Sequence, residues 1–247
     1  MQKLKLKLEC FESLDSTNTY LKERAKKGAP EGTVVIANAQ TGGRGRMGRS
    51  FCSPPALGIY MSLLLRPEAK SDCVQSLTAF TAVAVCRAIE SLTGLDPEIK
   101  WINDIMLNGK KICGILCESC FCGSGASFAV IGIGLNVITR AEDFPPELRY
   151  TAGSIFSESG KLCERGKLIA AILSELDAMY GAWCEDKSAY LEEYRKRCGT
   201  VGRSITLSSS DGTAEATAVC IEPDFGLRVR LSSGETTVIH SGEISVR

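Results

Sequence analysis

EIKWINDIMLNGKKICGILCES, residues 98–119, is the stretch of the sequence that decides the fold. Asn108-Gly109 lies between two apolar-rich runs, and an Asn-Gly pair favours the type I′ turn that joins antiparallel strands. The stretch is therefore predicted to form a strand, a hairpin at Asn108-Gly109 and a returning strand. The apolar run ASFAVIGIGLNVI, residues 126–138, predicts a further buried strand.

The residues before this hairpin predict three more strands and two helices. Apolar alternation or a short apolar run predicts a strand, and a longer stretch with helical signals predicts a helix. The first helix has capping residues at Asp15 to Thr17 and a stop at Gly28. The expected strands are 3–8, 33–39 and 58–65, and the expected helices are 15–28 and 71–92.

The residues after residue 138 predict first helices and then, after Gly199, short strands. A loop with Pro145 and Pro146 leads to expected helices at 162–183 and 187–197. After Cys198-Gly199, short β-like runs separated by Gly, Asp and Ser predict a small β barrel. The expected layout is a mixed α and β domain over residues 1–199 and an all-β domain over residues 200–247.

Charge and hydropathy narrow the function classes. The 247 residues include 29 basic and 29 acidic side chains, so no overall field attracts nucleic acid or an anionic membrane. No apolar run approaches the length of a membrane span, and the first ten residues alternate Lys with Leu instead of forming a signal peptide. A cytoplasmic protein without membrane association is expected.

The 12 cysteines are expected to be reduced, buried thiols, because a domain of this size does not need disulfides. Cys113, Cys117, Cys120 and Cys122 form half of a zinc pattern, but the second paired knuckle is missing and the single histidine, His240, is distant in sequence. On a strand, Cys113 and Cys117 would point to the same face. No metal-ligating residues are assigned.

Two nucleotide motifs are excluded by their spacing. GKLCERGKL from Gly160 has one residue too many for a P-loop and lacks the Ser or Thr that meets Mg²⁺. GIGLNV from Gly132 has two of the Rossmann glycines, but it lies inside an expected strand instead of opening a helix.

The loop GRGRMGR, residues 43–49, indicates an anion site. No acidic residue occurs between Gly32 and Pro67, whereas Arg44, Arg46, Arg49 and Arg66 occur there. Glycines between the arginines allow close approach of the backbone to a ligand and closure of the loop over it. A small anionic ligand is favoured over an RNA-contacting arginine-glycine tract, because the loop is short and lies between two apolar strands.

The hairpin carries a second polar set. Lys100 and Lys111 bracket Asn103 and Asp104, and such a set can hold phosphates, a magnesium ion and a reacting carboxyl group. Taken singly, Lys111 could be surface charge, and Trp101 could be a core residue or a base-stacking platform.

Together, six ordered segments across nearly the whole chain resemble the catalytic part of the biotin protein ligases. They are DSTN at Asp15, GRGRMGR at Gly43, KWIND at Lys100, KICGIL at Lys111, GIGLNV at Gly132 and GEIS at Gly242. The resemblance implies an α+β fold with a mixed β-sheet and packed helices of the class II synthetase-like kind, plus a small C-terminal SH3-like β-barrel. It implies ATP-dependent, AMP-forming activation of biotin with Mg²⁺, and transfer to a lysine of a biotin carboxyl carrier protein.

The resemblance also assigns residues. Ser16, Thr17 and Asn18 would line the biotin pocket with Gln40; Arg44, Gly45 and Arg46 would close over biotin and the adenylate. Lys111 would contact the biotin carboxylate and the α-phosphate. The expected catalytic set is Lys111, Arg44, Arg46 and Asp104, and the remaining expected ligand-binding residues are Lys100, Trp101, Asn103 and Asn136.

The sequence departs from the family pattern at three places: Ile102 stands for the usual proline, Phe51 for a common tryptophan, and Gly58-Ile59-Tyr60 for Asn-Leu-Tyr. Because DSTN begins at Asp15, no N-terminal DNA-binding domain and no direct DNA binding are expected; a homodimer is possible. The alternatives are a lipoate or octanoate ligase or transferase of the same fold, and a binding module without catalysis.

Overall fold

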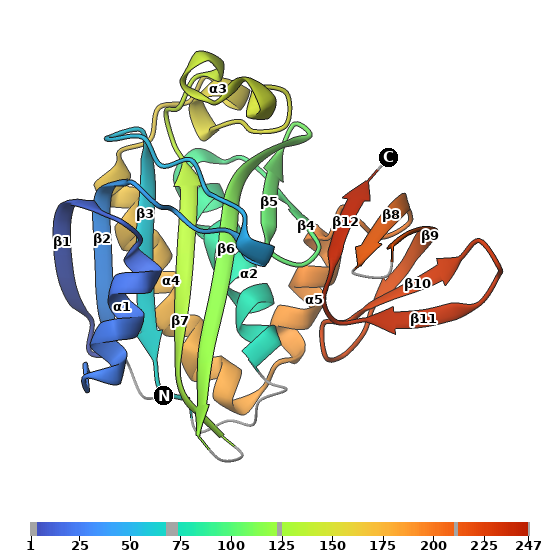
Figure 1. The fold of residues 1–247 in the computed structure, drawn as a ribbon, viewed down its shortest axis with the longest axis horizontal. Helices are drawn as coiled ribbons and strands as arrows, with labels where there is room; N and C mark the ends of the chain where they lie inside the picture. The colour runs from blue at the N-terminus through green and yellow to red at the C-terminus, as the bar shows by residue number, and fades with distance from the viewer. Residues whose placement is uncertain (1–3, 68–73, 123–124, 210–211, 247) are drawn as a thin grey trace.

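The computed structural model describes residues 4–67, 74–122, 125–209 and 212–246, and builds them around two sheets (Figure 1). The large sheet has the order β1-β2-β3-β7-β6-β5-β4, and the small sheet has the order β11-β10-β9-β8-β12. Only the β1–β2 pair is parallel among the described ladders; the other pairs are antiparallel. The mixed sheet with helices and the C-terminal β sheet confirm the predicted fold class.

The strands of the large sheet are β1 (Lys7–Leu14), β2 (Thr33–Gln40), β3 (Gly58–Leu65), β4 (Glu98–Lys100), β5 (Asp104–Leu107), β6 (Lys110–Cys122) and β7 (Gly125–Asn136). The helices are α1 (Thr17–Lys26), α2 (Val74–Thr93), α3 (Ile155–Ser159), α4 (Arg165–Glu185) and α5 (Ser188–Arg197), with short 3₁₀ turns η1 (Arg46–Gly48), η3 (Ala141–Asp143) and η4 (Pro146–Leu148). The small sheet contains β8 (Ser204–Ser209), β9 (Gly212–Ile221), β10 (Leu227–Leu231), β11 (Thr236–Ile239) and β12 (Glu243–Val246).

Helices cover the two faces of the large sheet unequally. α2 and α4 pack behind the sheet, while α1 lies across part of the front (Figure 1). Along β7, Ile131 and Ile133 belong to the core behind the sheet, and Val130 packs under α1. Farther along the same front face β7 carries Gly132 and Gly134, because side chains of a strand alternate between faces. The front of the sheet therefore changes from apolar side chains, under α1, to glycines against which the side chains of Asn18 and Phe51 lie.

The Asn108-Gly109 turn confirms the predicted hairpin. Asn108 has φ 50° and Gly109 has φ 80°, the two positive values that a type I′ turn requires. The prediction of one strand before this turn is wrong. The chain turns at 101–103, so β4 and β5 are two strands that form a hairpin of their own. The Trp101–Ile102 peptide bond in this turn is cis.

Other element boundaries also differ from the predictions. The first strand is Lys7–Leu14, so residues 4–6 of the expected strand 3–8 lie before it, and residue 3 lies outside the described residues. The strand begins at Lys7 because its partner β2 begins at Thr33, which pairs with Lys7. The helix expected from residue 162 begins at Arg165, and Leu162 is 78% exposed. Residues 71–73 of another expected helix lie outside the described residues. α3, η3, η4 and β12 were not predicted as elements.

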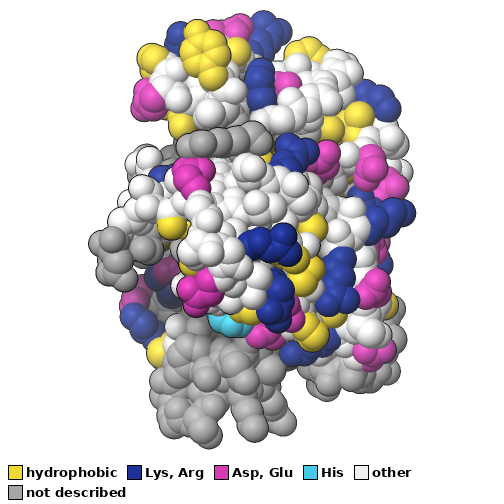
Figure 2. All heavy atoms as spheres, turned by 90° about the vertical axis from the view of Figure 1, so that its right-hand side faces the viewer, with side chains coloured by type: hydrophobic (Ala, Val, Ile, Leu, Met, Phe, Trp, Pro, Cys, Tyr) yellow, Lys and Arg dark blue, Asp and Glu magenta, His cyan; other side chains and the backbone are white. Residues whose placement is uncertain are grey.

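The small sheet is joined to the large one by buried contacts. Trp101 Nε1 donates a hydrogen bond to the Phe225 carbonyl oxygen (2.9 Å), and Trp101 N donates to Thr200 Oγ1 (3.0 Å). The fully buried Phe225 ring packs against Phe80 and Tyr194, with centroid distances of 5.6 and 5.5 Å. Figure 2 shows the end of the molecule that carries the small sheet, where basic and acidic side chains are interspersed.

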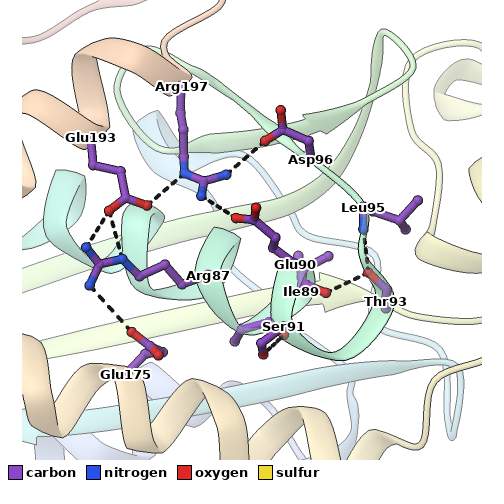
Figure 3. A network of polar contacts seen from close by, with 11 residues as sticks. Arg87, Ile89, Glu90, Ser91, Thr93, Leu95, Asp96, Glu175, Glu193 and Arg197 are labelled. Carbon is purple, nitrogen blue, oxygen red and sulfur yellow. Dashed lines mark hydrogen bonds and ion pairs between the residues drawn. The ribbon is translucent and has the colours of Figure 1, made fainter.

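A charged network fastens α5 to α2 and α4 (Figure 3). Glu193 of α5 accepts from Arg87 Nε of α2 (2.8 Å) and from Arg197 Nε (3.0 Å), and Arg87 also pairs with Glu175 of α4 (3.7 Å). Burial alone would raise the pKa of Glu193, but the hydrogen bonds from Arg87 and Arg197 lower it.

Among the described residues, no helix is long and apolar enough to span a bilayer.

Candidate functional site

Two adjoining cavities bring together almost all of the predicted site residues. The first, of about 50 Å³, lies beside the N-terminus of α1, and the second, of about 590 Å³, extends toward β4 and β12. Phe51 and Lys111 line both cavities. The predicted residues at the first cavity are Ser16, Thr17, Asn18, Gln40, Arg44, Gly45, Arg46, Asn103 and Lys111, and those at the second are Lys100, Asp104, Lys111 and Asn136.

Backbone forms the floor of the first cavity. Gly132 and Gly134 of β7 face the front of the sheet, and Gly114 of β6 pairs with Gly134. A Cβ atom at Gly134 would lie 2.6 Å from Phe51 Cε1, and one at Gly132 would collide with Asn18 Oδ1. Glycine in a strand permits this close approach. The floor therefore suits a flat ligand that rests against the main chain.

The end of α1 supplies the polar wall of this cavity. Ser16 caps the helix, and its Oγ accepts from Thr19 N (3.4 Å). Gln40 Oε1 accepts from Thr17 N (2.9 Å), and Gln40 Nε2 donates to Ser53 Oγ (2.9 Å). The capping pattern that predicted the helix thus also brings Thr17 and Gln40 to the cavity.

Asn18 continues this wall toward the middle of the sheet. Its Nδ2 donates to the Leu116 carbonyl (3.2 Å) and to Glu118 Oε2 (3.0 Å), and Glu118 pairs with Lys22 (2.5 Å). Burial would raise the pKa of Glu118, but hydrogen bonds from Lys22 and Asn18 and the charge of Arg44 lower it. Glu118 is therefore an anion held by an ion pair with Lys22 and a hydrogen bond from Asn18.

The arginine loop folds back on itself at the mouth of the first cavity. Arg44 forms a β-bridge with Ser50, and Gly45 N donates to the Arg49 carbonyl (2.7 Å). Arg46 crosses to the hairpin, where its Nη1 donates to Asn103 Oδ1 (2.8 Å) and its Nη2 donates to the Gly242 carbonyl (3.2 Å). Arg46 thus links the loop to the β4–β5 turn and to the small sheet, while Arg44 is exposed at the rim.

Lys111 lies at the junction of the cavities. Its Nζ is 2.7 Å from Asp104 Oδ1, which also accepts from Asn103 Nδ2 (3.0 Å). The main chain of Lys111 is held on both sides, because its N donates to the Thr151 carbonyl (2.8 Å) and its carbonyl accepts from Gly153 N (2.9 Å). The ammonium group is therefore anchored at a fixed place beside an anion.

Asn136 and Lys100 face the second cavity. The Asn136 side chain is 4% exposed, and its Nδ2 donates to the Gly153 carbonyl (2.9 Å), while its buried Oδ1 has no hydrogen-bond partner within the described part of the chain. Lys100 pairs with Asp104 across the β4–β5 ladder. An orphaned amide oxygen, a carboxylate and two ammonium groups suit a ligand that carries both phosphate and a bound cation.

Trp101 lies elsewhere. It is 3% exposed, packs in the core and contacts neither cavity. Its position supports the core alternative over base stacking. Cys113 and Cys117 lie on one face of β6, as predicted, and burial raises the pKa of the Cys117 thiol to about 12. Cys122 has no described side chain.

Several site residues were not assigned from the sequence. Phe51 was noted only as a departure from a pattern, and Gly114, Gly132 and Gly134 were not recognised as a floor. Alternating glycines within an apolar strand, as in GIGLN, were the available signal. No site residue is predicted in the segment after β7, but Thr151 and Gly153 of that segment hold the main chain of Lys111.

The fold and the paired cavities define an α+β domain with two adjoining ligand sites. The model of the biotin/lipoate A/B protein ligase family matches residues 10–136, and the chain belongs to this family.

Named relatives narrow the class. The bifunctional ligase/repressor BirA of Bacillus spizizenii is 37% identical over 237 residues, which cover 94% of this chain and 72% of BirA. The biotin--[acetyl-CoA-carboxylase] ligase of Mycobacterium tuberculosis is 28% identical, over 96% of this chain and 88% of that protein. The biotin protein ligase of Aquifex aeolicus in complex with biotin and ATP superposes with a TM-score of 0.83 at 26% identity, covering 97% of this chain and 98% of that chain.

Proposed function

We propose that the protein is a biotin protein ligase. It joins biotin to ATP, releases pyrophosphate, and transfers the biotinyl group from biotinyl-5′-AMP to a lysine of a biotin carboxyl carrier protein. The observation that carries the proposal is the pair of cavities that share Lys111 and Phe51, because an adenylate must occupy both. The relatives reported above are named for biotin, which favours biotin over the lipoate alternative.

The first half-reaction joins two anions. The carboxylate oxygen of biotin attacks the α-phosphorus of ATP, and the bond from that phosphorus to the pyrophosphate oxygen breaks. Lys111, at the junction, offsets the repulsion and stabilises the charge that develops on the phosphoryl oxygens. Lys111 also pairs with Asp104 (2.7 Å), so the carboxylate of biotin and the α-phosphate share its ammonium group with Asp104.

The arginine loop protects the product. Biotinyl-5′-AMP is a mixed anhydride that water hydrolyses, so the site must exclude water between the two half-reactions. Arg44 at the rim is placed to meet the bound anion, and Arg46 already ties the loop to Asn103. The loop's glycines allow the further closure that this role needs.

The second cavity also fits Mg²⁺ with the nucleotide. Magnesium in such sites takes one or two protein oxygens and the substrate phosphates. Asn136 Oδ1, which is buried without a partner, and the Asp104 carboxylate are the oxygens that would hold the ion. An ion held there would supply positive charge to the pyrophosphate leaving group.

In the second half-reaction, the amine of the acceptor lysine attacks the carbonyl carbon of the anhydride and displaces AMP. The amine must lose its proton, and Asp104 is the carboxylate beside the reacting centre that can accept or orient it. Cytoplasmic location, homodimer formation, and the absence of DNA binding and of a membrane partner stay predictions.

Pyrophosphate exchange into ATP tests the proposal. Biotin, lipoate and octanoate are each supplied as the acid, with a no-acid control. Exchange that requires biotin is the expected result. Exchange with lipoate or octanoate alone would keep the fold and change the substrate, and no exchange with any acid would leave a binding module.

A further inference from the structure

Beside the floor of the first cavity, and on the same face of the sheet, β6 places a carboxylate next to α1. Leu116 and Glu118 follow Gly114 on the front of the sheet, because alternate residues of a strand share a face. Glu118 Oε1 is 2.5 Å from Lys22 Nζ, and Glu118 Oε2 accepts from Asn18 Nδ2 (3.0 Å). Both members of the ion pair are about three-quarters buried, with 25% and 27% of their side chains exposed. The carboxylate reaches the cavity only through Asn18.

The contacts of Asn18 fix which way its amide group points. Nδ2 has two protons, and they are directed at the Leu116 carbonyl (3.2 Å) and at Glu118 Oε2. Ser62 Oγ, which is fully buried, donates to Asn18 Oδ1 (2.6 Å). A reversed amide would turn Nδ2 toward Ser62 and place its oxygen against two acceptors. The oxygen therefore lies over Gly132, on the floor of the cavity.

We propose that Glu118 is a positioning residue for recognition of the urea ring of biotin. By holding the Asn18 amide, it presents an acceptor oxygen, and not a donor, at the floor of the first cavity. Ser62 uses one of the two lone pairs of that oxygen, and the second can accept from a urea N–H group. The inference rests on the proposed function and adds a residue that contributes to selection of biotin.

A carboxylate suits this role better than an amide. An ionised carboxylate only accepts hydrogen bonds, whereas a glutamine could offer either oxygen or nitrogen to Asn18. Lys22 compensates the charge that would otherwise be costly to bury. The dithiolane ring of lipoate has no N–H donor, so an acceptor at this floor contributes to binding of biotin and not of lipoate.

The test compares Glu118→Ala with Glu118→Gln and with a control, Glu9→Ala. Glu9 also pairs with α1, through Arg24 (3.1 Å), but at the β1 side and away from the cavities. In biotin-dependent pyrophosphate exchange, Glu118→Ala is expected to raise KM for biotin up to about tenfold, the upper end for loss of one neutral hydrogen bond between the Asn18 oxygen and the urea ring, with KM for ATP unchanged. Glu118→Gln should recover part of the loss, and Glu9→Ala should have no effect.

Biotin methylated on either urea nitrogen gives a second readout. The wild-type protein should discriminate against the isomer that loses the Asn18 contact, and Glu118→Ala should discriminate about tenfold less. A poorly folded variant would lower the active fraction without changing this ratio. An active wild type in which Glu118→Ala keeps both KM for biotin and the methyl discrimination would overturn the inference alone; a wild type without biotin-dependent exchange would overturn the proposed function with it.

Discussion

Among the single residues, Lys111 combines a fixed main chain with a charged group at the junction of two cavities. We expect Lys111→Ala to lower kcat/KM for adenylate formation by about a hundredfold or more, the effect of removing one donor to a developing oxyanion. Lys110→Ala is the matched control, because Lys110 pairs with Glu158 (3.2 Å) and lines neither cavity. Pyrophosphate exchange by both variants is the measurement. Equal rates would exclude the role given to Lys111.

Gly134 contributes to the shape of the first cavity and not to its charge. We expect Gly134→Ala to raise KM for biotin about tenfold or more while the chain still folds, because its Cβ would meet the Phe51 ring at 2.6 Å and push it into the ligand space. Adding Phe51→Leu should restore part of the affinity by removing the obstacle. Steady-state kinetics of the single and double variants measure this. No recovery in the double variant would mean that the strand itself had moved.

Chemically distinctive residues could be predicted from the sequence, and shape-defining residues could not. Arg44, Lys111 and Asp104 are charged residues next to glycines or within apolar strands, and such placement indicates a ligand site. Gly134 acquires its role through the pairing of β7 with β3 and β6, and Phe51 through the loop that places its ring against Gly134. Trp101 shows the opposite case, since its motif was recognisable but its side chain is part of the core.

At the scale of elements, the hairpin between β5 and β6 depends on its turn. Gly109 has φ 80°, so we expect Gly109→Ala to lower the free energy of unfolding by about 1 kcal/mol. Gly166→Ala in α4 is the same substitution at a helical position with open space around it. There we expect the free energy of unfolding to rise by up to about 0.5 kcal/mol. Urea unfolding measures both, and equal shifts would contradict the backbone explanation.

Elements with strong local signals were predictable. The Asn-Gly turn, the capped α1 and the apolar β3 have the expected places because their signals lie within the segment itself. The start of β1 and the division between β4 and β5 depend on partner strands, which a single segment does not contain. The η3, η4 and α3 segment lacks periodicity and is held mainly by contacts with Lys111, Asn136 and its own caps.

At the scale of the whole molecule, ion pairs between helices tie stability to pH. The pKa of Glu193 is lowered in the folded chain, so its contribution is complete above the ordinary carboxyl value of about 4.3 and is lost as the pH falls through the lower folded value. We expect the melting temperature to fall between about pH 5 and about pH 3, and Glu193→Gln to reduce that slope. Glu192→Gln, at a 72% exposed carboxylate of the same helix, is the control. Equal slopes in the two variants would assign the acid sensitivity to other groups.

The order of the seven strands was beyond the reach of pattern reasoning. β3 pairs with β7 across more than sixty residues, and the choice depends on which apolar faces α2 and α4 must cover. The expected change to an all-β region after Gly199 did follow from composition, because short β runs and turn residues are local. The contacts of that region with Trp101 and Arg46 could not be predicted from either partner alone.

The ring of Phe51 borders both cavities, so its size can be altered to change the shape of the space where they meet. A smaller side chain at this position would enlarge the binding space beside Lys111. A bulky tag carried near the carboxyl end of a biotin analogue could then be accepted by the altered protein and rejected by the natural one. Such a matched pair would label chosen proteins in a living cell beside the normal vitamin, without competition between the two.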